Sequence, residues 1–198
     1  MSHALSAGAA GSSFSPLRLQ ERTLALQIFA VVAGTALLAL SSYITVPMIP
    51  VPVTMQTFAV TLIGALYGWR LGALTVAAWL AEGTVGLPVF SNGTSGFMVF
   101  AGPTAGYLVS FPLIAALTGW LAERGWNGQR PWLAFAAALS ANLLCLVVGA
   151  SWLASIVGVE RAIMAGVLPF LVGAVLKSGL SATVLAGIAR VQARKVRG

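Results

Sequence analysis

The 198-residue sequence has few ionisable residues. It contains no aspartate, four acidic residues in all, one histidine and one cysteine, and charged residues make up only 8% of the chain. A soluble domain of ordinary composition is about 25% charged, so these residues are too few to cover the surface of a water-soluble globule. The chain is 59% hydrophobic and its mean hydropathy is +0.94. We therefore expect an all-α integral membrane protein whose main solvent is lipid.

The same absences exclude several kinds of chemistry. The only histidine, His3, and the only cysteine, Cys145, cannot form a metal site or a disulfide framework. A serine triad would lack its base, and the sequence contains no phosphate-binding or dinucleotide-binding glycine motif. The net charge is +7, but the basic residues separate long apolar runs instead of forming the basic face of a nucleic-acid-binding protein. We expect neither an enzyme nor a nucleic-acid partner.

Long apolar segments divided by turn residues predict six transmembrane helices. A spanning helix needs about 20 mostly apolar residues, and prolines, glycines and arginines divide the chain into segments of that order or shorter. The expected spans are residues 23–46, 53–68, 71–86, 101–122, 131–157 and 162–191. They form one domain over residues 1–198, in which the Ser-, Gly- and Ala-rich residues 1–17 are expected to be disordered.

The basic residues predict the orientation of these spans. With six spans and a cytoplasmic N-terminus, nine basic residues lie on the cytoplasmic side, only Arg161 lies outside, and Lys177 falls within the last span. An excess of Lys and Arg in cytoplasmic loops is typical of membrane proteins. We therefore expect both termini in the cytoplasm.

This orientation places two uncharged loops outside the membrane, at residues 46–54 and 83–96. The first is rich in proline and the second in glycine. Irregular backbone at membrane depth is tolerated where it is buried in protein or lines a cavity. We expect the two loops to form a lid over an external ligand pocket; tight structural turns are the alternative.

Two ionisable side chains fall inside or next to the membrane. Lys177 lies near the middle of the last expected span, too central to reach either interface easily, and we assign it to a functional site. Glu82 lies near the external end of the third span, where ligand contact, pairing with another group and reach to the interface all remain open.

Three strings of residues resemble the BioY family. They are Ile49-Pro50-Val51-Pro52-Val53-Thr54-Met55-Gln56-Thr57, Gly86-Leu87-Pro88-Val89-Phe90 and Gly102-Pro103-Thr104-Ala105-Gly106-Tyr107. The likeness covers about residues 24–190. It implies a six-helix substrate-binding (S) component of an energy-coupling-factor (ECF) transporter in the bacterial cytoplasmic membrane. Such a component binds biotin in an outward-facing pocket under the loop between helices 1 and 2.

The resemblance also implies partners and site residues. The partners are a transmembrane coupling protein and two ATP-binding-cassette ATPases; only the ATPases use ATP, so the chain itself needs no cofactor. Biotin carries a carboxylate, an apolar body and a ureido ring with two donors and one acceptor. We expect Lys177 to bind the carboxylate, and Gln56 and Asn92 to hydrogen-bond the carboxylate or the ureido group. Tyr107 and Phe90 are expected to wall the bicyclic ring.

Two positions depart from the family pattern. The last span resembles Pro-Phe…Gly-Asp-x-x-Lys, but Ala174 stands in place of the ligand-binding Asp, and Ala105 replaces a glycine of the third string. The first change removes an acceptor for a ureido N–H; Glu82, water or another neutral group are the possible substitutes. It also leaves open an S component for another small vitamin. A stand-alone secondary transporter coupled to protons through Glu82 and a structural subunit without a ligand are further alternatives.

Overall fold

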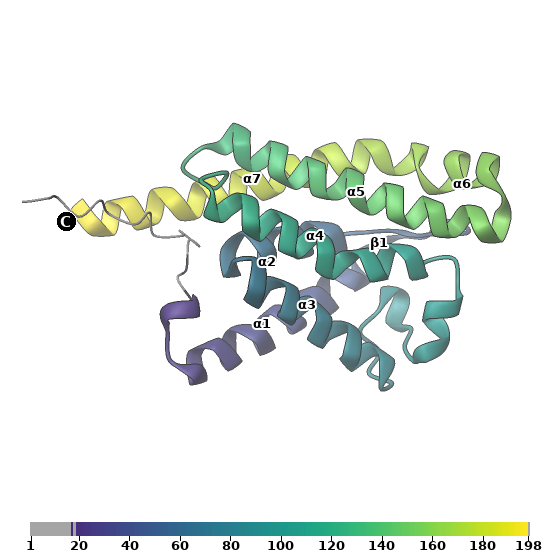
Figure 1. The fold of residues 1–198 in the computed structure, drawn as a ribbon, viewed down its shortest axis with the longest axis horizontal. Coiled ribbons are helices and arrows are strands. Elements are labelled where there is room, and N and C mark those ends of the chain that lie inside the picture. Colours follow the sequence, from purple (N-terminus) through teal and green to yellow (C-terminus); the bar gives the residue numbers. More distant parts are fainter. Residues whose placement is uncertain (1–16, 18, 198) are drawn as a thin grey trace, which may run out of the picture.

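The computed structural model describes Leu17 and residues 19–197 of the chain. The expected disorder of residues 1–17 therefore lies almost entirely outside the described residues. Most of the described chain is helical (Figure 1). The main elements are α1 (Leu24–Tyr43), β1 (Thr45–Val46), β2 (Val53–Thr54), α2 (Gln56–Tyr67), α3 (Trp69–Thr84), α4 (Ala105–Glu123), α5 (Pro131–Val157), α6 (Val159–Gly166) and α7 (Leu168–Arg197). Short 3₁₀ turns occur at Leu19–Glu21, Ser91–Gly93 and Phe97–Ala101.

Helix α4 lies at the centre of the bundle. It packs against α2 and α3 and also against α5, which in turn packs against α6 and α7. Figure 1 shows α5, α6 and α7 on one side of α4 and the first three helices on the other, with the last turns of α7 extending beyond the bundle. The α4 residues are consequently buried along most of their length.

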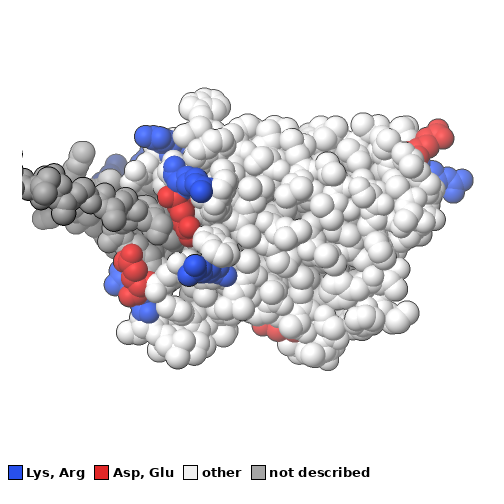
Figure 2. All heavy atoms as spheres, viewed as in Figure 1, with Lys and Arg blue, Asp and Glu red and all other residues white. Residues whose placement is uncertain are grey.

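The surface has the charge distribution of a membrane protein. Within the described residues, four segments are long and apolar enough to cross a membrane, namely α1, α4, α5 and the stretch Val159–Arg194 that contains α6 and most of α7. Basic side chains gather at one end of the molecule, a smaller charged group lies at the opposite end, and the surface between is almost uncharged (Figure 2). A multi-pass membrane protein is the architecture that this pattern supports.

The helices α2 and α3 form the hairpin that the sequence predicts. Gly68 separates them with a φ of +83°, a conformation in the left-handed region that favours glycine. With 12 residues, α2 is about 18 Å long, less than the hydrocarbon thickness of about 30 Å. Helix α2 is therefore too short to cross the hydrocarbon layer by itself.

The last expected span, residues 162–191, is wrong as a single helix. The chain breaks at Val167 into α6 and α7. Pro169 explains the break, because it has no N–H to donate and restricts the conformation of the residue before it. Hydropathy could not locate this break, because both helices are apolar.

The proline-rich loop at residues 46–54 also differs from expectation, because it contains strand structure. Thr45 and Val46 pair antiparallel with Thr54 and Val53. This two-stranded ribbon leads directly into α2, since Met55 N donates to Ile44 O at 3.1 Å. The fourth expected span starts at Ala105 instead of residue 101, because residues 97–101 form a 3₁₀ turn.

Close contact between α2 and α4 depends on Gly64. A Cβ added there would collide with the Ala115 carbonyl and the Thr118 hydroxyl of α4. The small residue thus allows the two helices to approach at backbone distance, as in other membrane helix pairs. This contact holds α2 firmly beside α4.

We predict that Gly64→Ala destabilises the protein. Overpacking a tight contact costs about 1–3 kcal/mol, which corresponds to a fall of about 2–12 °C in the apparent melting temperature in detergent. Gly187→Ala is the matched control, because Gly187 is an exposed position of α7 where an added Cβ would meet nothing within 4 Å. This variant should have an unchanged or slightly raised melting temperature. Equal melting temperatures for the two variants would contradict this account of the α2–α4 contact.

Candidate functional site: a cavity beneath two loops

A cavity of about 340 Å³ lies between the helix bundle and the two uncharged loops. This volume is at the lower end of the range for small-molecule sites. Its walls come from α2, α4, α5 and α7, and its cover comes from residues 51–54 and 90–104. The lining residues are Val51, Pro52, Thr54, Gln56, Thr57, Phe90, Ser91, Asn92, Thr94, Val99, Gly102, Thr104, Tyr107, Leu108, Phe111, Asn142, Cys145, Leu146, Phe170, Ala174 and Lys177.

The second loop is fixed to the bundle at three consecutive carbonyls. Tyr43 Oη donates to Pro88 O at 2.6 Å, Trp79 Nε1 to Val89 O at 3.2 Å, and Ser42 Oγ to Phe90 O at 3.2 Å. Side chains of α1 and α3 thereby satisfy loop carbonyls that have no place in a helix or sheet. The loop can be uncharged and irregular because the bundle supplies its hydrogen bonds.

Phe90 joins this loop to the core. Its ring is almost fully buried, packs edge-on against Trp79 at 5.1 Å between centroids, and fills the space next to Gly83. Trp79 in turn stacks on Phe111, which lines the cavity. An aromatic cluster therefore separates α3 from the cavity.

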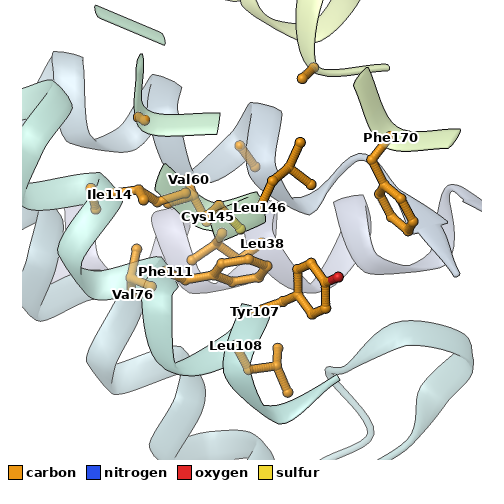
Figure 3. Packing of buried hydrophobic residues seen from close by; sticks show 14 of the residues in the cluster. Leu38, Val60, Val76, Tyr107, Leu108, Phe111, Ile114, Cys145, Leu146 and Phe170 are labelled. Carbon is orange, nitrogen blue, oxygen red and sulfur yellow. The ribbon is translucent and has the colours of Figure 1, made fainter. Parts of the chain in front are cut away.

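Tyr107 and Phe170 form an apolar wall on the side of α4 and α7. Their rings stack at 6.1 Å between centroids with planes 21° apart, and Figure 3 shows them facing each other near Leu146 and Phe111. The Tyr107 hydroxyl donates to Gly166 O at 2.8 Å. This bond satisfies a carbonyl at the break between α6 and α7, so the same side chain shapes the cavity and holds the interrupted helix.

Lys177 brings an ammonium group to the cavity beside the start of α2. Its Nζ donates to Thr57 Oγ1 at 3.2 Å. No carboxylate lies within ion-pair distance of it among the residues that the structure describes. The first turn of α2 adds positive potential from its N-terminal amide groups, because Met55 provides no side-chain cap. This corner of the cavity is suited to a ligand anion.

Two polar atoms around the cavity are buried without a hydrogen-bond partner. They are Gln56 Nε2 and Ser91 Oγ. Gln56 is 4% exposed, and its Oε1 accepts from Thr54 Oγ1 at 2.8 Å, so the amide nitrogen is the group left to donate. Buried polar groups normally have partners, and a ligand in this cavity would supply them.

A second polar group lies across α5 and α7. Asn142 Nδ2 donates to Ala138 O at 2.9 Å and to Ser178 Oγ at 3.1 Å, and Ser178 Oγ donates to Ala174 O at 2.7 Å. Asn142 and Ala174 both line the cavity. The polar groups of the site are thus in two places, one around Lys177 and Gln56 and one around Asn142.

The structure brings five of the six sequence-predicted site residues to this cavity. Gln56, Phe90, Asn92, Tyr107 and Lys177 all line it. Asn92 lies at an exposed position of the covering loop with a φ of +57°.

Glu82 is placed elsewhere. It is half-buried on α3, and none of the α3 residues, all of which the structure describes, lines the cavity. The physical reason is the aromatic cluster, since the Phe90 ring lies against Gly83, the neighbour of Glu82. The expectation that Glu82 replaces the missing acceptor therefore lacks structural support.

Sequence reasoning missed Asn142 and Thr57. Asn142 is a polar amide within the long apolar run of α5, and such side chains in membrane helices usually face other helices or a cavity. That signal was present in the sequence. Thr57 follows Gln56 directly, but its contact with Lys177 spans 120 positions and could not be inferred from spacing.

The arrangement of the cavity is suited to binding a small molecule. The cavity is mostly apolar, with one cation and a few neutral donors and acceptors. Within the described part of the chain, no group of three or more His, Cys, Asp or Glu residues could hold a metal ion. A small, largely apolar anion with polar atoms at its other end fits these groups best.

Comparison with known proteins identifies the family. The model of the BioY family matches residues 13–194. The chain belongs to the BioY family. Among BioY relatives, the probable biotin transporter of Pyrococcus horikoshii is 31% identical over 78% of this chain and 90% of its own. The probable biotin transporter BioY of Rickettsia prowazekii is 32% identical over 80% and 81%.

A solved S-component structure has the same fold. The S-component for biotin from an ECF-type ABC transporter superposes with a TM-score of 0.72 at 24% identity, covering 86% of this chain and 94% of that one. The biotin transporter BioY of Rhizobium etli is a further relative, 34% identical over 70% of this chain and 78% of its own. The curated BioY relatives are thus transporters, and this BioY chain is not an enzyme.

We predict that the Tyr107 hydroxyl stabilises the break between α6 and α7. Tyr107→Phe leaves the buried Gly166 carbonyl without its donor, at a cost of about 1–3 kcal/mol. The apparent melting temperature in detergent should fall by about 2–12 °C. Tyr43→Phe removes a similar bond to Pro88 O from an exposed side chain and should cost less. A Tyr107→Phe protein as stable as wild type would refute this role.

Proposed function

We propose that this chain is the biotin-capturing S component of an ECF-type transporter. The observation that carries the proposal is Lys177, an ammonium at an apolar cavity of suitable size with no carboxylate partner among the described residues. The names of the BioY relatives agree with this function.

The chemistry of biotin matches the two polar places of the cavity. Its carboxylate would lie at Lys177, where Thr57 and the Gln56 amide nitrogen add neutral donors. Its bicyclic ring would pack against Tyr107, Phe170 and Phe90. The ureido ring would then lie toward the other polar group. We expect Asn92 and Ser91 of the covering loop to close over the bound ligand.

The proposed membrane arrangement has six spans, with α6 and α7 together as the last one. Both termini lie in the cytoplasm, at the end where Arg22, Arg70, Arg124 and Arg130 flank helices. Figure 2 supports this orientation, because basic side chains are concentrated at one end of the molecule. The cavity and both loops then face outward from the bacterial cytoplasmic membrane.

The proposed partners are a transmembrane coupling protein and two ATP-binding-cassette ATPases, which use the ATP. Membrane lipid covers the apolar helix faces, where large side chains such as Phe29, Val32 and Leu176 are exposed. The described part of the chain contains no nucleotide-binding motif of its own, so the energy for uptake comes from these partners.

A second candidate function is an S component for another small vitamin with a carboxylate. Ala174 favours this candidate, because it stands where the family pattern has the ligand-binding Asp. The stand-alone transporter is less well supported, because the carboxylate it needs, Glu82, is not at the cavity. A titration against a panel of vitamins separates the first two, and co-purification with an ATPase pair separates an S component from a stand-alone carrier.

Lys177→Gln should abolish high-affinity biotin binding. Removing one partner of a buried charge pair costs about 2–5 kcal/mol, or about thirtyfold or more in affinity. Quenching of tryptophan fluorescence during a biotin titration measures the effect, and the melting temperature checks the fold. Arg161→Gln removes an exposed positive charge from the end of the protein that is proposed to face outward. This variant should bind biotin as wild type does.

Biotin methyl ester tests the assignment of the carboxylate. The ester should bind the Lys177→Gln variant about as well as biotin does, because the variant has no ammonium at position 177 to pair with the carboxylate of biotin. Wild-type protein that binds acid and ester equally would show that Lys177 does not contact the carboxylate. Wild-type protein that binds neither, but binds another vitamin, would reject biotin as the ligand.

Cysteine labelling tests the orientation. In a Cys145→Ala background, Thr94→Cys in the covering loop should react with a membrane-impermeant maleimide in intact cells, and biotin should protect it. Gln129→Cys, between α4 and α5 at the basic end, should react only after the cells are opened; both side chains are exposed. External labelling at position 129 would reverse the proposed topology.

A further inference from the structure

The cavity contains a buried amide oxygen that the expected site does not use. Asn142 of α5 is 3% exposed and lines the cavity beside Ala174. Ala174 offers no side-chain acceptor, although a ureido ring presents two N–H donors. The acceptor that this ring requires must therefore come from another residue or from water.

The hydrogen bonds around Asn142 determine which way its amide faces. Ser178 Oγ gives its hydrogen to Ala174 O at 2.7 Å, so toward Asn142 it can only accept. The Ala138 carbonyl is also an acceptor. The atom of Asn142 that contacts both must be the NH₂ group, with two hydrogens for two acceptors. The amide cannot flip without placing its oxygen against two acceptors.

The amide oxygen of Asn142 is consequently left for another donor. No donor contacts Oδ1 among the residues that the structure describes. It is also absent from the buried atoms without a partner, as expected for an oxygen that reaches the open space of the cavity. A neutral acceptor with a fixed direction is thus available at the wall where Ala174 lies.

The other side-chain amide and carboxylate oxygens considered from the sequence are less suitable. Gln56 Oε1 already accepts from Thr54 Oγ1 at 2.8 Å, and Asn92 lies at an exposed position on the covering loop. Glu82, the carboxylate considered from the sequence, is not at the cavity. Asn142 is the buried side-chain carbonyl of the lining that keeps its accepting capacity free.

We propose that Asn142 accepts a hydrogen bond from a ureido N–H of the ligand and determines specificity for that group. Ser178 and Ala138 act through it by fixing the amide orientation, so Ser178 is a positioning residue. The inference rests on the proposed function, since it assumes a ligand with a cyclic urea. It makes Ala174 compatible with biotin, because a neutral amide replaces the carboxylate of the family pattern.

A double-mutant cycle between protein and ligand tests the proposal. Biotin and its two N-methyl ureido derivatives are titrated against wild type and Asn142→Ala, with tryptophan quenching as the readout. Asn142→Ala should weaken biotin binding about tenfold or more. One of the two N-methyl derivatives should bind wild type about tenfold more weakly than biotin, and that difference should shrink to less than about threefold in the variant.

Ser178→Ala provides a milder second variant, in case loss of Asn142 impairs folding. It removes one of the two acceptors that orient the amide, so biotin affinity should fall about threefold to tenfold, with a smaller penalty for the same N-methyl derivative. Ser181→Ala is the matched control. Ser181 also makes a buried hydrogen bond from α7, to Thr61 at 3.0 Å, but it does not line the cavity, and biotin binding should not change.

A charged analogue separates an amide acceptor from a carboxylate acceptor. In 2-iminobiotin the ureido group becomes a guanidinium at neutral pH. A carboxylate would pair with this cation, whereas a neutral amide leaves the charge unpaired in a largely apolar cavity. Wild type should therefore bind 2-iminobiotin at pH 7 more weakly than biotin, and Ala174→Asp should reduce that difference.

The outcomes distinguish the inference from the proposed function. Wild-type protein that fails to bind biotin rejects the function. If wild type binds biotin but the N-methyl penalties are the same in Asn142→Ala or Ser178→Ala as in wild type, the function stands and the role of Asn142 is overturned. Stronger binding of 2-iminobiotin than of biotin by wild type would also overturn it, because it would require an anionic acceptor.

Discussion

The candidate site depends on an ammonium group that has no carboxylate partner within the described part of the chain. Lys177 lies on α7 beside the cavity, and a threonine hydroxyl is its hydrogen-bond acceptor among the described residues. A charge in a largely apolar bundle is costly unless it is paired. The start of α2 and the donors of Gln56 and Thr57 strengthen the positive character of the same corner, which is therefore suited to an anion.

The loop over the cavity and the break between α6 and α7 contain backbone carbonyls that need hydrogen-bond donors, and side chains of the bundle provide them. The covering loop is uncharged because Ser42, Tyr43 and Trp79 provide its hydrogen bonds from neighbouring helices. Tyr107 does the same at the break between α6 and α7. Tyr107 thus satisfies a backbone carbonyl and also lines the cavity. The stability of the fold and the shape of the cavity therefore depend on the same side chain.

Much of the fold could be predicted from the sequence, because hydropathy and turn residues mark helix ends. The bounds of α5 and the Gly68 turn between α2 and α3 agree with expectation. The β1–β2 ribbon and the break at Val167 could not be predicted this way. Both depend on which groups form hydrogen bonds with the backbone. Hydropathy averaged along the sequence does not contain that information.

Residues of the candidate site could be predicted where one residue type is unusual in its surroundings. Lys177 is conspicuous as an ion within an apolar span, and family resemblance directed attention to Gln56, Phe90, Asn92 and Tyr107, which all lie at the cavity. Glu82 is unusual in the same sense, yet Phe90 separates its helix from the cavity. Chemical rarity identifies a residue as notable, but packing decides whether it reaches the ligand.

The hydrogen bonds between α2 and α7 have a consequence for the energetics of ligand release. Thr57 pairs with Lys177 and Thr61 with Ser181, each one turn further along both helices, so the two helices run in the same direction. Under the proposed function, a ligand anion that draws the ammonium from Thr57 exchanges one hydrogen bond of Lys177 for another. On departure of the ligand, Thr57 recovers the bond, so the empty site is not left with a bare cation. Under the proposed function, the threonine hydroxyl therefore competes with a ligand anion for the ammonium and limits how tightly that anion can be held.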